Sequence, residues 1–348
     1  MSSQVKSDLY KEAGVDIDLA QNLLKKVKNK ISSTRRPEML SPIGGFGGLF
    51  QIDLSKYKNP VMVSSIDGVG TKLMVAMMME KYDSVGHDIV NHCIDDIAVQ
   101  GAEPVYFMDY IGIGKLRSPL YEHVLEGIAD ACKASNCAVL GGETAEMPGM
   151  YGNDFDLVGV ITGIVEKDQL ITGEKIKAGH VAVGLGSSGL HTNGYSLARK
   201  VLFDKCGYDV HTVLDELGES VGEALLKPHT CYWPAIKQAL DSDNVTIDGM
   251  AHITGGGLYD NVPRILPEDV DVEFDKTALP VLPIFKLIVE KGEIDATEAY
   301  RVFNMGIGMV WFVPEEQAEA AVAICKEAGF EAAICGKVTS GSQKVTVK

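Results

Sequence analysis

Four short runs of mostly apolar residues, separated by segments with helical spacing, constrain the fold of the first half most. The runs are VMVSSID (61–67), VYFMDYI (105–111), CAVLGGE (137–143) and LVGVITGIV (157–165). Segments 87–102 and 119–135 lie between them and repeat apolar residues at helical intervals. In the first of these segments the polar residues, Asp88, His92, Asp95 and Asp96, fall toward the other side, which is usually a solvated helix face. Alternating strands and helices predict an α/β fold.

Chain length and a polar break predict two domains. A chain of 348 residues exceeds the size at which one core usually stops growing. Segment 166–180 is polar and punctuated by glycine, and strand-like sequence resumes at HVAVGLG (180–186). We expect a helical arm and glycine-rich loop at 1–50, within an N-terminal domain that continues through 51–170. A C-terminal α/β domain follows at 171–348, with helices near 192–203, 231–240 and 316–328.

Charge and apolar content exclude several classes of protein. The formal net charge of −16 disfavours nucleic acid and anionic lipid as partners. No apolar run approaches the ~20 residues that cross a bilayer, and the N-terminal residues resemble neither a secretory signal nor a transit peptide. The odd number of cysteines, seven without a C-x-x-C pair, predicts reduced thiols. We expect a cytoplasmic protein.

Acidic residues end three of the apolar runs. Asp67, Asp109 and Glu143 stand there, and Asp96 lies in the first helical segment. Mg²⁺ prefers carboxylate oxygens together with substrate phosphates, so Asp67, Asp96 and Glu143 are candidate ligands. Each carboxylate taken singly is explained equally well as the cap of a turn or helix.

Glycine-rich segments predict phosphate binding. In DGVGTK (67–72), Gly68 and Gly70 expose backbone N–H groups, while Thr71 adds a hydroxyl and Lys72 a charge. The segment lacks the Walker spacing, so another ATP-binding fold is indicated. GLGSSG (184–189) matches the dinucleotide pattern weakly, and an NAD enzyme is a minor alternative. A further glycine run is HITGGGLYDN (252–261), and either run is also compatible with a plain turn.

Long motifs in a fixed order resemble the phosphoribosylformylglycinamidine cyclo-ligase (AIR synthetase) family. They are YKEAGVDID (10–18), TRRPE (34–38), GGFGGLF (44–50), DGVGTK (67–72), QGAEPVYFMDY (100–110), GGETAEMPGMY (141–151), GSSGLHTNGYSLARK (186–200), HITGGGLYDNVPR (252–264) and FNMGIGM (303–309). The match runs nearly end to end. One departure is Asp95, where the family usually has Asn.

The resemblance implies an ATP-dependent, Mg²⁺-dependent enzyme that forms a homodimer, with the N-terminal sheets of two subunits joining into a β-barrel. It implies small-molecule substrates, ATP and formylglycinamidine ribonucleotide, and neither nucleic acid nor membrane as a partner. ATP and its ion are expected at Gly44, Gly45, Phe46, Gly47, Gly48, Asp67, Gly68, Gly70, Thr71, Lys72, Asp96, Asp109, Gly141, Gly142 and Glu143. The ribonucleotide is expected at Ser187, Ser188, Gly189, His191, Thr192, Asn193, Gly255, Gly256 and Gly257.

The implied reaction is ring closure to aminoimidazole ribonucleotide, with phosphorylation of the formyl amide oxygen before attack by the amidine nitrogen. Lys72, His191 and Asn193 are the catalytic candidates, and loop 44–50 is expected to close over ATP. A lone histidine such as His191 is also often structural. Two other functions remain open from the sequence: a related ATP-dependent kinase or selenophosphate synthetase, and a non-catalytic nucleotide-binding module.

Overall fold

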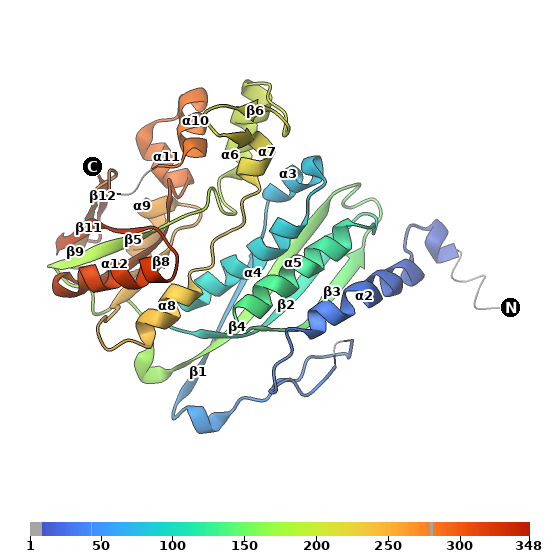
Figure 1. Cartoon of the computed structure of the whole chain (residues 1–348), viewed down its shortest axis with the longest axis horizontal. Coiled ribbons are helices and arrows are strands. Elements are labelled where there is room, and N and C mark those ends of the chain that lie inside the picture. The colour runs from blue at the N-terminus through green and yellow to red at the C-terminus, as the bar shows by residue number, and fades with distance from the viewer. Residues whose placement is uncertain (1–8, 43, 279–280) are drawn as a thin grey trace.

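Two large β-sheets, one from each half of the chain, organise the molecule (Figure 1). The computed structural model describes residues 9–42, 44–278 and 281–348, so the expectations for residues 1–8 and for Ile43 of the glycine-rich loop lie outside the described residues. The sheets have strand orders β1-β4-β2-β3 and β12-β9-β11-β5-β10-β8, and β6 pairs with β7 in a small third sheet. The predicted mixed α/β class is confirmed.

The first sheet contains the four predicted runs as strands. Its strands are β1 (Pro60–Gly68), β2 (Glu103–Ile113), β3 (Ala138–Glu146) and β4 (Phe155–Glu166). β4 is antiparallel to both β1 and β2, whereas β2 and β3 are parallel. A parallel pair needs a crossover, which the helix between β2 and β3 supplies. The sheet is therefore mixed.

Helices cover one face of this sheet. The helices of the first half are α2 (Ile17–Ser32), α3 (Lys72–Met79), α4 (Asp83–Ala98) and α5 (Leu120–Ala134), with a short 3-10 turn at Leu54–Lys56. α4 packs on β1, β2 and β4, and α5 packs on α4, β3 and α2. The expectation that the polar side of α4 is solvated was wrong: Asp88, His92 and Asp95 are buried. The second half of the chain packs against that side, which periodicity along a single helix does not reveal.

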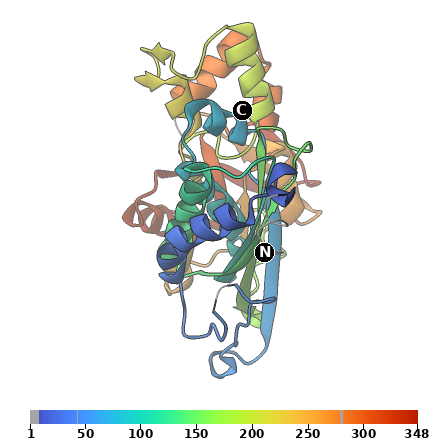
Figure 2. The ribbon, with the colours of Figure 1, turned by 90° about the vertical axis from the view of Figure 1, so that its right-hand side faces the viewer.

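The opposite face of the first sheet has no helix layer among the described residues. Residues of β1 alternate between exposed and partly buried, and Met62 and Ile66 point to the uncovered side. The side view in Figure 2 shows β1, in light blue, along one edge of the molecule, away from α5. Alternating burial of this kind is typical of a sheet with one packed face.

The second sheet is antiparallel except at one edge. Its strands are β5 (His180–Gly186), β8 (Gly249–His252), β9 (Val270–Phe274), β10 (Ile307–Pro314), β11 (Ala332–Ser340) and β12 (Val345–Val347). Among the described strand pairs of this second sheet, only β9 and β12 are parallel. β5, which precedes the GLGSSG segment, is antiparallel to both neighbours. A dinucleotide site requires a parallel βαβ unit, so the NAD alternative is excluded.

Helices and short elements complete the second half. They are 3-10 turns at Lys167–Gln169, Val262–Ile265 and Glu315–Gln317, a π-helix at Lys200–Lys205, β6 (Val213–Leu214), β7 (Glu219–Ser220), α6 (Tyr195–Arg199), α7 (Val221–Leu225), α8 (Trp233–Leu240), α9 (Gly257–Asn261), α10 (Pro283–Gly292), α11 (Ala296–Val302) and α12 (Ala318–Glu327). The helices predicted near 192–203, 231–240 and 316–328 are confirmed within a few residues.

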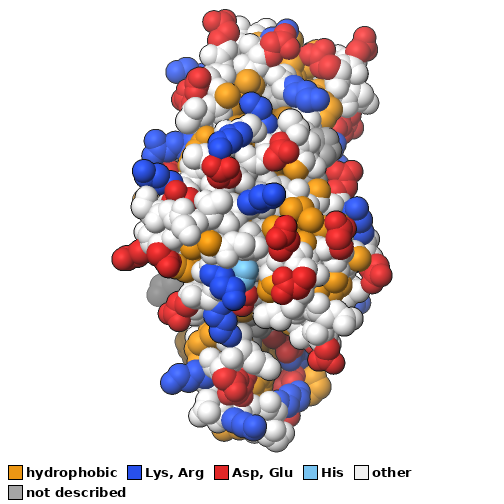
Figure 3. Space-filling model, turned by 90° about the vertical axis from the view of Figure 1, so that its left-hand side faces the viewer, with side chains coloured by type: hydrophobic (Ala, Val, Ile, Leu, Met, Phe, Trp, Pro, Cys, Tyr) orange, Lys and Arg blue, Asp and Glu red, His pale blue; other side chains and the backbone are white. Residues whose placement is uncertain are grey.

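The surface carries charges of both signs (Figure 3), and the cysteines are unpaired. Acidic and basic side chains are interspersed over the face seen in Figure 3. All seven cysteines are free, and Cys93, Cys132 and Cys137 are buried. Among the described residues, no helix combines the length and apolar character needed to cross a membrane.

Candidate active site

The register of the first sheet sets the distances between the predicted acidic ligands. Asp67 of β1 lies opposite Gly159 of β4, which in turn lies opposite Asp109 of β2. Asp109 lies opposite Gly142 of β3, the neighbour of Glu143. Strands are about 4.8 Å apart, so Asp67 and Glu143 are separated by about 14 Å. Ligands of one Mg²⁺ lie about 2.1 Å from it, so the predicted ligands divide into two groups.

The first group is Asp67 and Asp96, which share the neighbour His92. The Nε2 atom of His92 lies 2.8 Å from Oδ2 of Asp67 and 3.9 Å from Oδ2 of Asp96. Oδ1 of Asp96 also lies 2.9 Å from Nδ1 of His252. Oδ2 of Asp96 accepts a hydrogen bond from the Ser65 hydroxyl. β1 and α4 therefore bring together two carboxylates that are 29 positions apart in sequence.

Both carboxylates of this group are ionised at neutral pH. Burial raises the pKa of Asp67, but the hydrogen bond and charge of His92 outweigh it and lower the pKa overall. Burial likewise raises the pKa of Asp96, and His252 outweighs it. The Asp67 and Asp96 side chains remain 37% and 26% exposed. Two ionised, partly exposed carboxylates fit a hard divalent cation such as Mg²⁺.

The second group lies at the glycine-rich loop. A cavity of about 330 Å³ is lined by α2 and by predicted ATP-site residues, which are Gly44, Gly45, Phe46, Gly47, Gly48, Asp109, Gly141, Gly142 and Glu143. Phe46 is fully exposed, whereas Gly48 packs against the side chain of Leu140. A larger cavity of about 630 Å³ lies beside segment 164–175 and α8, and none of the predicted residues lines it. The loop and the acidic edge of β3 thus meet in one place.

Asp109 is a buried acid of the second group. Burial and the nearby charge of Glu143 raise the pKa of Asp109 to about 7. Its carboxylate lies where a Cβ on Gly142 would be, so only glycine at position 142 leaves room for it. Asp109 is therefore partly protonated at neutral pH and differs in charge from Asp67 and Asp96.

Loops from the second half reach the Asp67 side of the first sheet. The hydroxyls of Thr71 and Ser196 lie 3.3 Å apart. A Cβ on Gly255 would lie 3.3 Å from Oδ1 of Asn193, so the predicted substrate residues of the two loops are neighbours. The structure thus gathers DGVGTK, Asn193 and the second glycine run around one region.

Several other predicted substrate residues hold the loops themselves. The Ser187 hydroxyl donates to Oδ1 of Asn304, and the Ser188 hydroxyl donates to the Pro228 carbonyl. Gly189 is buried, and its carbonyl accepts from Asn304. Gly256 and Gly257 have φ angles of 100° and 58°, which other residues rarely adopt. These positions shape the site from within the loops.

Lys72 is buried within the protein rather than exposed to a ligand. Its Nζ donates to Oδ1 of Asp88 at 2.9 Å, to the His191 carbonyl at 3.1 Å and to the Lys227 carbonyl at 2.7 Å. These three bonds use all three protons of an ammonium group. A phosphate contact by Lys72 would require one of these bonds to be exchanged.

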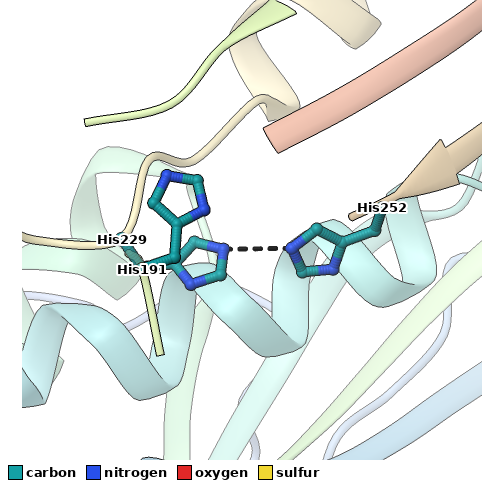
Figure 4. Close-up of side chains that lie close together, drawn as sticks. All are labelled: His191, His229 and His252. Carbon is teal, nitrogen blue, oxygen red and sulfur yellow. Dashed lines mark hydrogen bonds between the residues drawn. The ribbon is translucent and has the colours of Figure 1, made fainter. Parts of the chain in front are cut away.

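His191 belongs to a buried group of imidazoles. It is 1% exposed, has a φ of 60°, and stacks on His229 with ring centroids 4.1 Å apart. Nε2 of His229 lies 3.1 Å from Nε2 of His252, the contact drawn in Figure 4. Burial lowers the pKa of all three histidines, to the greatest extent for His191 and His229. Neutral rings thus fill the space behind Asp96.

Sequence reasoning missed four residues of this region. Asp88, His92 and Asp95 were assigned to a solvated helix face, and His229 lies in a segment without glycine. Thr192, a predicted substrate residue, is buried with its hydroxyl 2.7 Å from Nδ1 of His92. The clustering of polar residues on α4 was the one available signal, and only the packing of the second half gives it meaning.

Comparisons with known proteins match both halves of the chain. Residues 52–165 match the AIR synthase related protein, N-terminal domain, and residues 177–348 match its C-terminal domain. Phosphoribosylformylglycinamidine cyclo-ligase of Alkaliphilus oremlandii is 45% identical over 337 residues, 97% of this chain and 98% of that protein. The protein of the same name from Bacillus mycoides is 47% identical over 339 residues, 97% of each chain.

Solved structures with low sequence identity share the fold. Thiamine-monophosphate kinase of Stenotrophomonas maltophilia matches with a TM-score of 0.67 and 17% identity, covering 94% of this chain and 95% of that one. Hydrogenase maturation protein HypE, solved in complex with ATP, matches with a TM-score of 0.66 and 17% identity, covering 97% and 93%. At this identity the likeness concerns the fold alone.

Proposed function

The chain belongs to the phosphoribosylformylglycinamidine cyclo-ligases of the AIR synthase related family, and on this premise we propose its reaction. It closes the ring of formylglycinamidine ribonucleotide to give aminoimidazole ribonucleotide, while ATP becomes ADP and phosphate. The observation that carries this proposal is 45% identity to a named cyclo-ligase along 97% of the chain.

The chemistry requires a better leaving group at the formyl carbon. Transfer of the γ-phosphoryl group of ATP to the formyl amide oxygen provides one. The amidine nitrogen then attacks that carbon, the C–O bond breaks, and phosphate and a proton leave. Phosphoryl transfer depends mainly on positioning and charge neutralisation, so no protein nucleophile is needed.

Asp67 and Asp96 are the residues that would hold Mg²⁺. A bound Mg²⁺ supplies neutralisation of phosphate charge. Their ionised state, partial exposure and closeness to Thr71 and the second-half loops support this role. Glu143 does not fit the same ion within one chain, so we assign it with Asp109 to the glycine-loop cavity. There it would orient ATP or bind a separate ion.

The substrate roles need adjusting to the burial of the predicted residues. Asn193 is partly exposed beside Gly255, so we propose that it contacts the ribonucleotide. His191 and Lys72 are buried, so we propose that they position the surrounding loops. Loop 44–50 would exclude water from the activated intermediate by closing over ATP.

The uncovered face of the first sheet supports a homodimer. Ile66, Met62 and Met108 are 67%, 43% and 37% exposed, and an apolar sheet face is normally covered. A second copy placed face to face would bury this surface and close the two sheets into a barrel.

The function is tested with the purified chain, ATP, Mg²⁺ and formylglycinamidine ribonucleotide. Mass spectrometry should detect a ribonucleotide product that has lost one water, in equal amount to the ADP formed. Omission of ATP should abolish the product. Intact ribonucleotide in the presence of ATP turnover, or intact ATP under all conditions, would overturn the proposal.

A further inference from the structure

Four buried side chains from separate segments gather where α4 meets the second half of the chain. They are Asp95 on α4, His191 after β5, His229 before α8, and His252 at the end of β8. We propose that they form a binding site for a transition-metal ion, with Zn²⁺ as the best match. This site shares none of its four ligands with the Asp67–Asp96 pair, which it adjoins through His252, and it does not rest on the proposed reaction.

Two of the distances among these side chains match those between ligands of a four-coordinate ion. One ring nitrogen from each of His191, His229 and His252 lies within 4.8 Å of the other two. Nε2 of His229 is 3.1 Å from Nε2 of His252 and 3.5 Å from Oδ2 of Asp95. Ligands about 2.0–2.1 Å from a tetrahedral Zn²⁺ lie about 3.3 Å from each other, midway between these values.

Two of the four groups have an unused polar atom directed into the protein. Oδ2 of Asp95 and Nδ1 of His191 are buried and have no hydrogen-bond partner among the described residues. Oδ1 of Asp95 is already used, because it accepts from the Tyr232 backbone N–H at 2.9 Å. Buried polar atoms are nearly always paired, so two unpaired atoms in one cluster point to a missing ligand.

The other nitrogen of each ring lies near an oxygen atom. Nδ1 of His252 lies 2.9 Å from Oδ1 of Asp96, and Nδ1 of His229 lies 3.4 Å from the Thr192 hydroxyl. Nε2 of His191 lies 3.3 Å from the Thr230 hydroxyl and accepts long hydrogen bonds from the backbone N–H groups of Ser188 and Thr230 at 3.4 and 3.5 Å, so metal binding through Nδ1 requires the His191 proton to move to Nε2. For His229 and His252, an oxygen acceptor that holds the proton on Nδ1 leaves the lone pair of Nε2 for a metal, as in most histidine metal sites.

The donor atoms select the type of metal. Three neutral imidazoles and one carboxylate suit Zn²⁺ or a neighbouring first-row ion, whereas Mg²⁺ and Ca²⁺ prefer oxygen ligands. The ring of His191 stacks on His229 with 26° between their planes, so it must rotate about its Cβ–Cγ bond to direct Nδ1 at the same point. Figure 4 shows the three rings close together, with His229 and His252 facing each other.

Metal binding would connect the two halves of the chain. Asp95 belongs to the helix layer of the first sheet, and the histidines belong to the second half. His252 would also be held against Asp96, fixing the carboxylate that we assign to Mg²⁺.

The experiment uses Co²⁺ as a spectroscopic substitute for Zn²⁺. The purified chain is stripped with a chelator and titrated with Co²⁺ in excess Mg²⁺, so that the Asp67–Asp96 pair is already occupied. We expect one equivalent to bind with the intense visible bands of tetrahedral Co²⁺, to be displaced by Zn²⁺, and to raise the Tm. Absence of a bound equivalent, or only the weak bands of octahedral Co²⁺, would overturn the proposal.

Variants show whether these four side chains form the site. Asp95→Asn keeps the acceptor for Tyr232, and His229→Gln keeps a polar side chain of similar reach. Each should weaken Co²⁺ binding at least about tenfold, the smallest effect expected when even a supporting partner of a metal ligand is lost. His180→Gln, at a buried histidine of β5 outside the cluster, should bind as the unchanged chain does. Equal affinity in all three variants, each with a cooperative unfolding transition, would place the ion elsewhere and refute the proposal.

Discussion

Lys72 and Asp88 form an ion pair that is completely shielded from solvent, with Nζ 2.9 Å and 2.8 Å from the two carboxylate oxygens. Oδ1 of Asp88 also accepts from the His229 backbone N–H at 2.7 Å. Through the carbonyls of His191 and Lys227, the ammonium of Lys72 binds the same loops. The pair therefore connects α3 and α4 with the loops of the second half.

Removing one partner of this pair should strongly destabilise the protein. Lys72→Met leaves a buried, unpaired carboxylate, and we expect a loss of about 3–5 kcal/mol in the free energy of unfolding. Urea denaturation measures it. Lys237→Met removes an exposed partner of Asp241 and should change stability by less than about 1 kcal/mol. A double variant, Lys72→Met with Asp88→Leu, should recover much of the loss, and a purely additive result would contradict the pairing.

Loss of the Asp67 charge should impair use of Mg²⁺. Asp67→Asn keeps the size of the side chain but weakens a cation ligand, so we expect kcat at limiting Mg²⁺ to fall by roughly 100-fold. Excess Mg²⁺ should restore part of the lost kcat. The control is Asp130→Asn, at a half-exposed aspartate of α5 paired with Lys30, which should keep normal rates. Unchanged Mg²⁺ dependence in Asp67→Asn would refute the assignment.

Asp109 should make the protein less stable as pH rises. The pKa of Asp109 is about 7 in the folded chain, whereas the ordinary value is 3.8. Between pH 4 and 7 the unfolded state therefore releases a proton that the folded state retains. The free energy of unfolding therefore falls by up to roughly 4 kcal/mol across this window, and it is level above the window. Urea denaturation without divalent cations should show a weaker decline for Asp109→Asn. An equal decline in both proteins would contradict the shift.

Alanine substitutions at two glycines of the glycine-rich loop should show whether packing of the loop against Leu140 affects ATP binding. A Cβ on Gly48 meets the Leu140 side chain, whereas a Cβ on Gly47 meets nothing within 4 Å. Gly48→Ala should displace the loop and raise KM for ATP by roughly tenfold, with Gly47→Ala as the matched control. Steady-state kinetics at saturating ribonucleotide measures both. Equal KM values would argue against a role for this loop in ATP binding.

The uncovered face of the first sheet should control association. Ile66→Lys places a charge on that face, and we expect the dimer to dissociate to a monomer in light scattering after size exclusion. Leu54→Lys is the control, since Leu54 is 64% exposed, close to the 67% of Ile66, but lies outside the sheet. A dimer that persists in Ile66→Lys would exclude this face as the interface.

The sequence by itself determined the strands of the first sheet and most helices, because apolar spacing reflects local geometry. It also placed Asp67 near the end of β1, whereas Asp109 and Glu143, which were expected at strand ends, lie within β2 and β3. Local pattern and family resemblance together were sufficient for the fold class and the reaction.

Tertiary structure alone decided how those residues are grouped. Strand register separates Asp67 from Glu143 by about 14 Å, and a single sequence carries no direct information on register between distant strands. Packing of the second half on α4 buries Asp88 and Asp95, which accept hydrogen bonds from the backbone N–H groups of His229 and Tyr232. Periodicity identifies a polar helix face, but what covers that face depends on contacts between segments more than 100 residues apart.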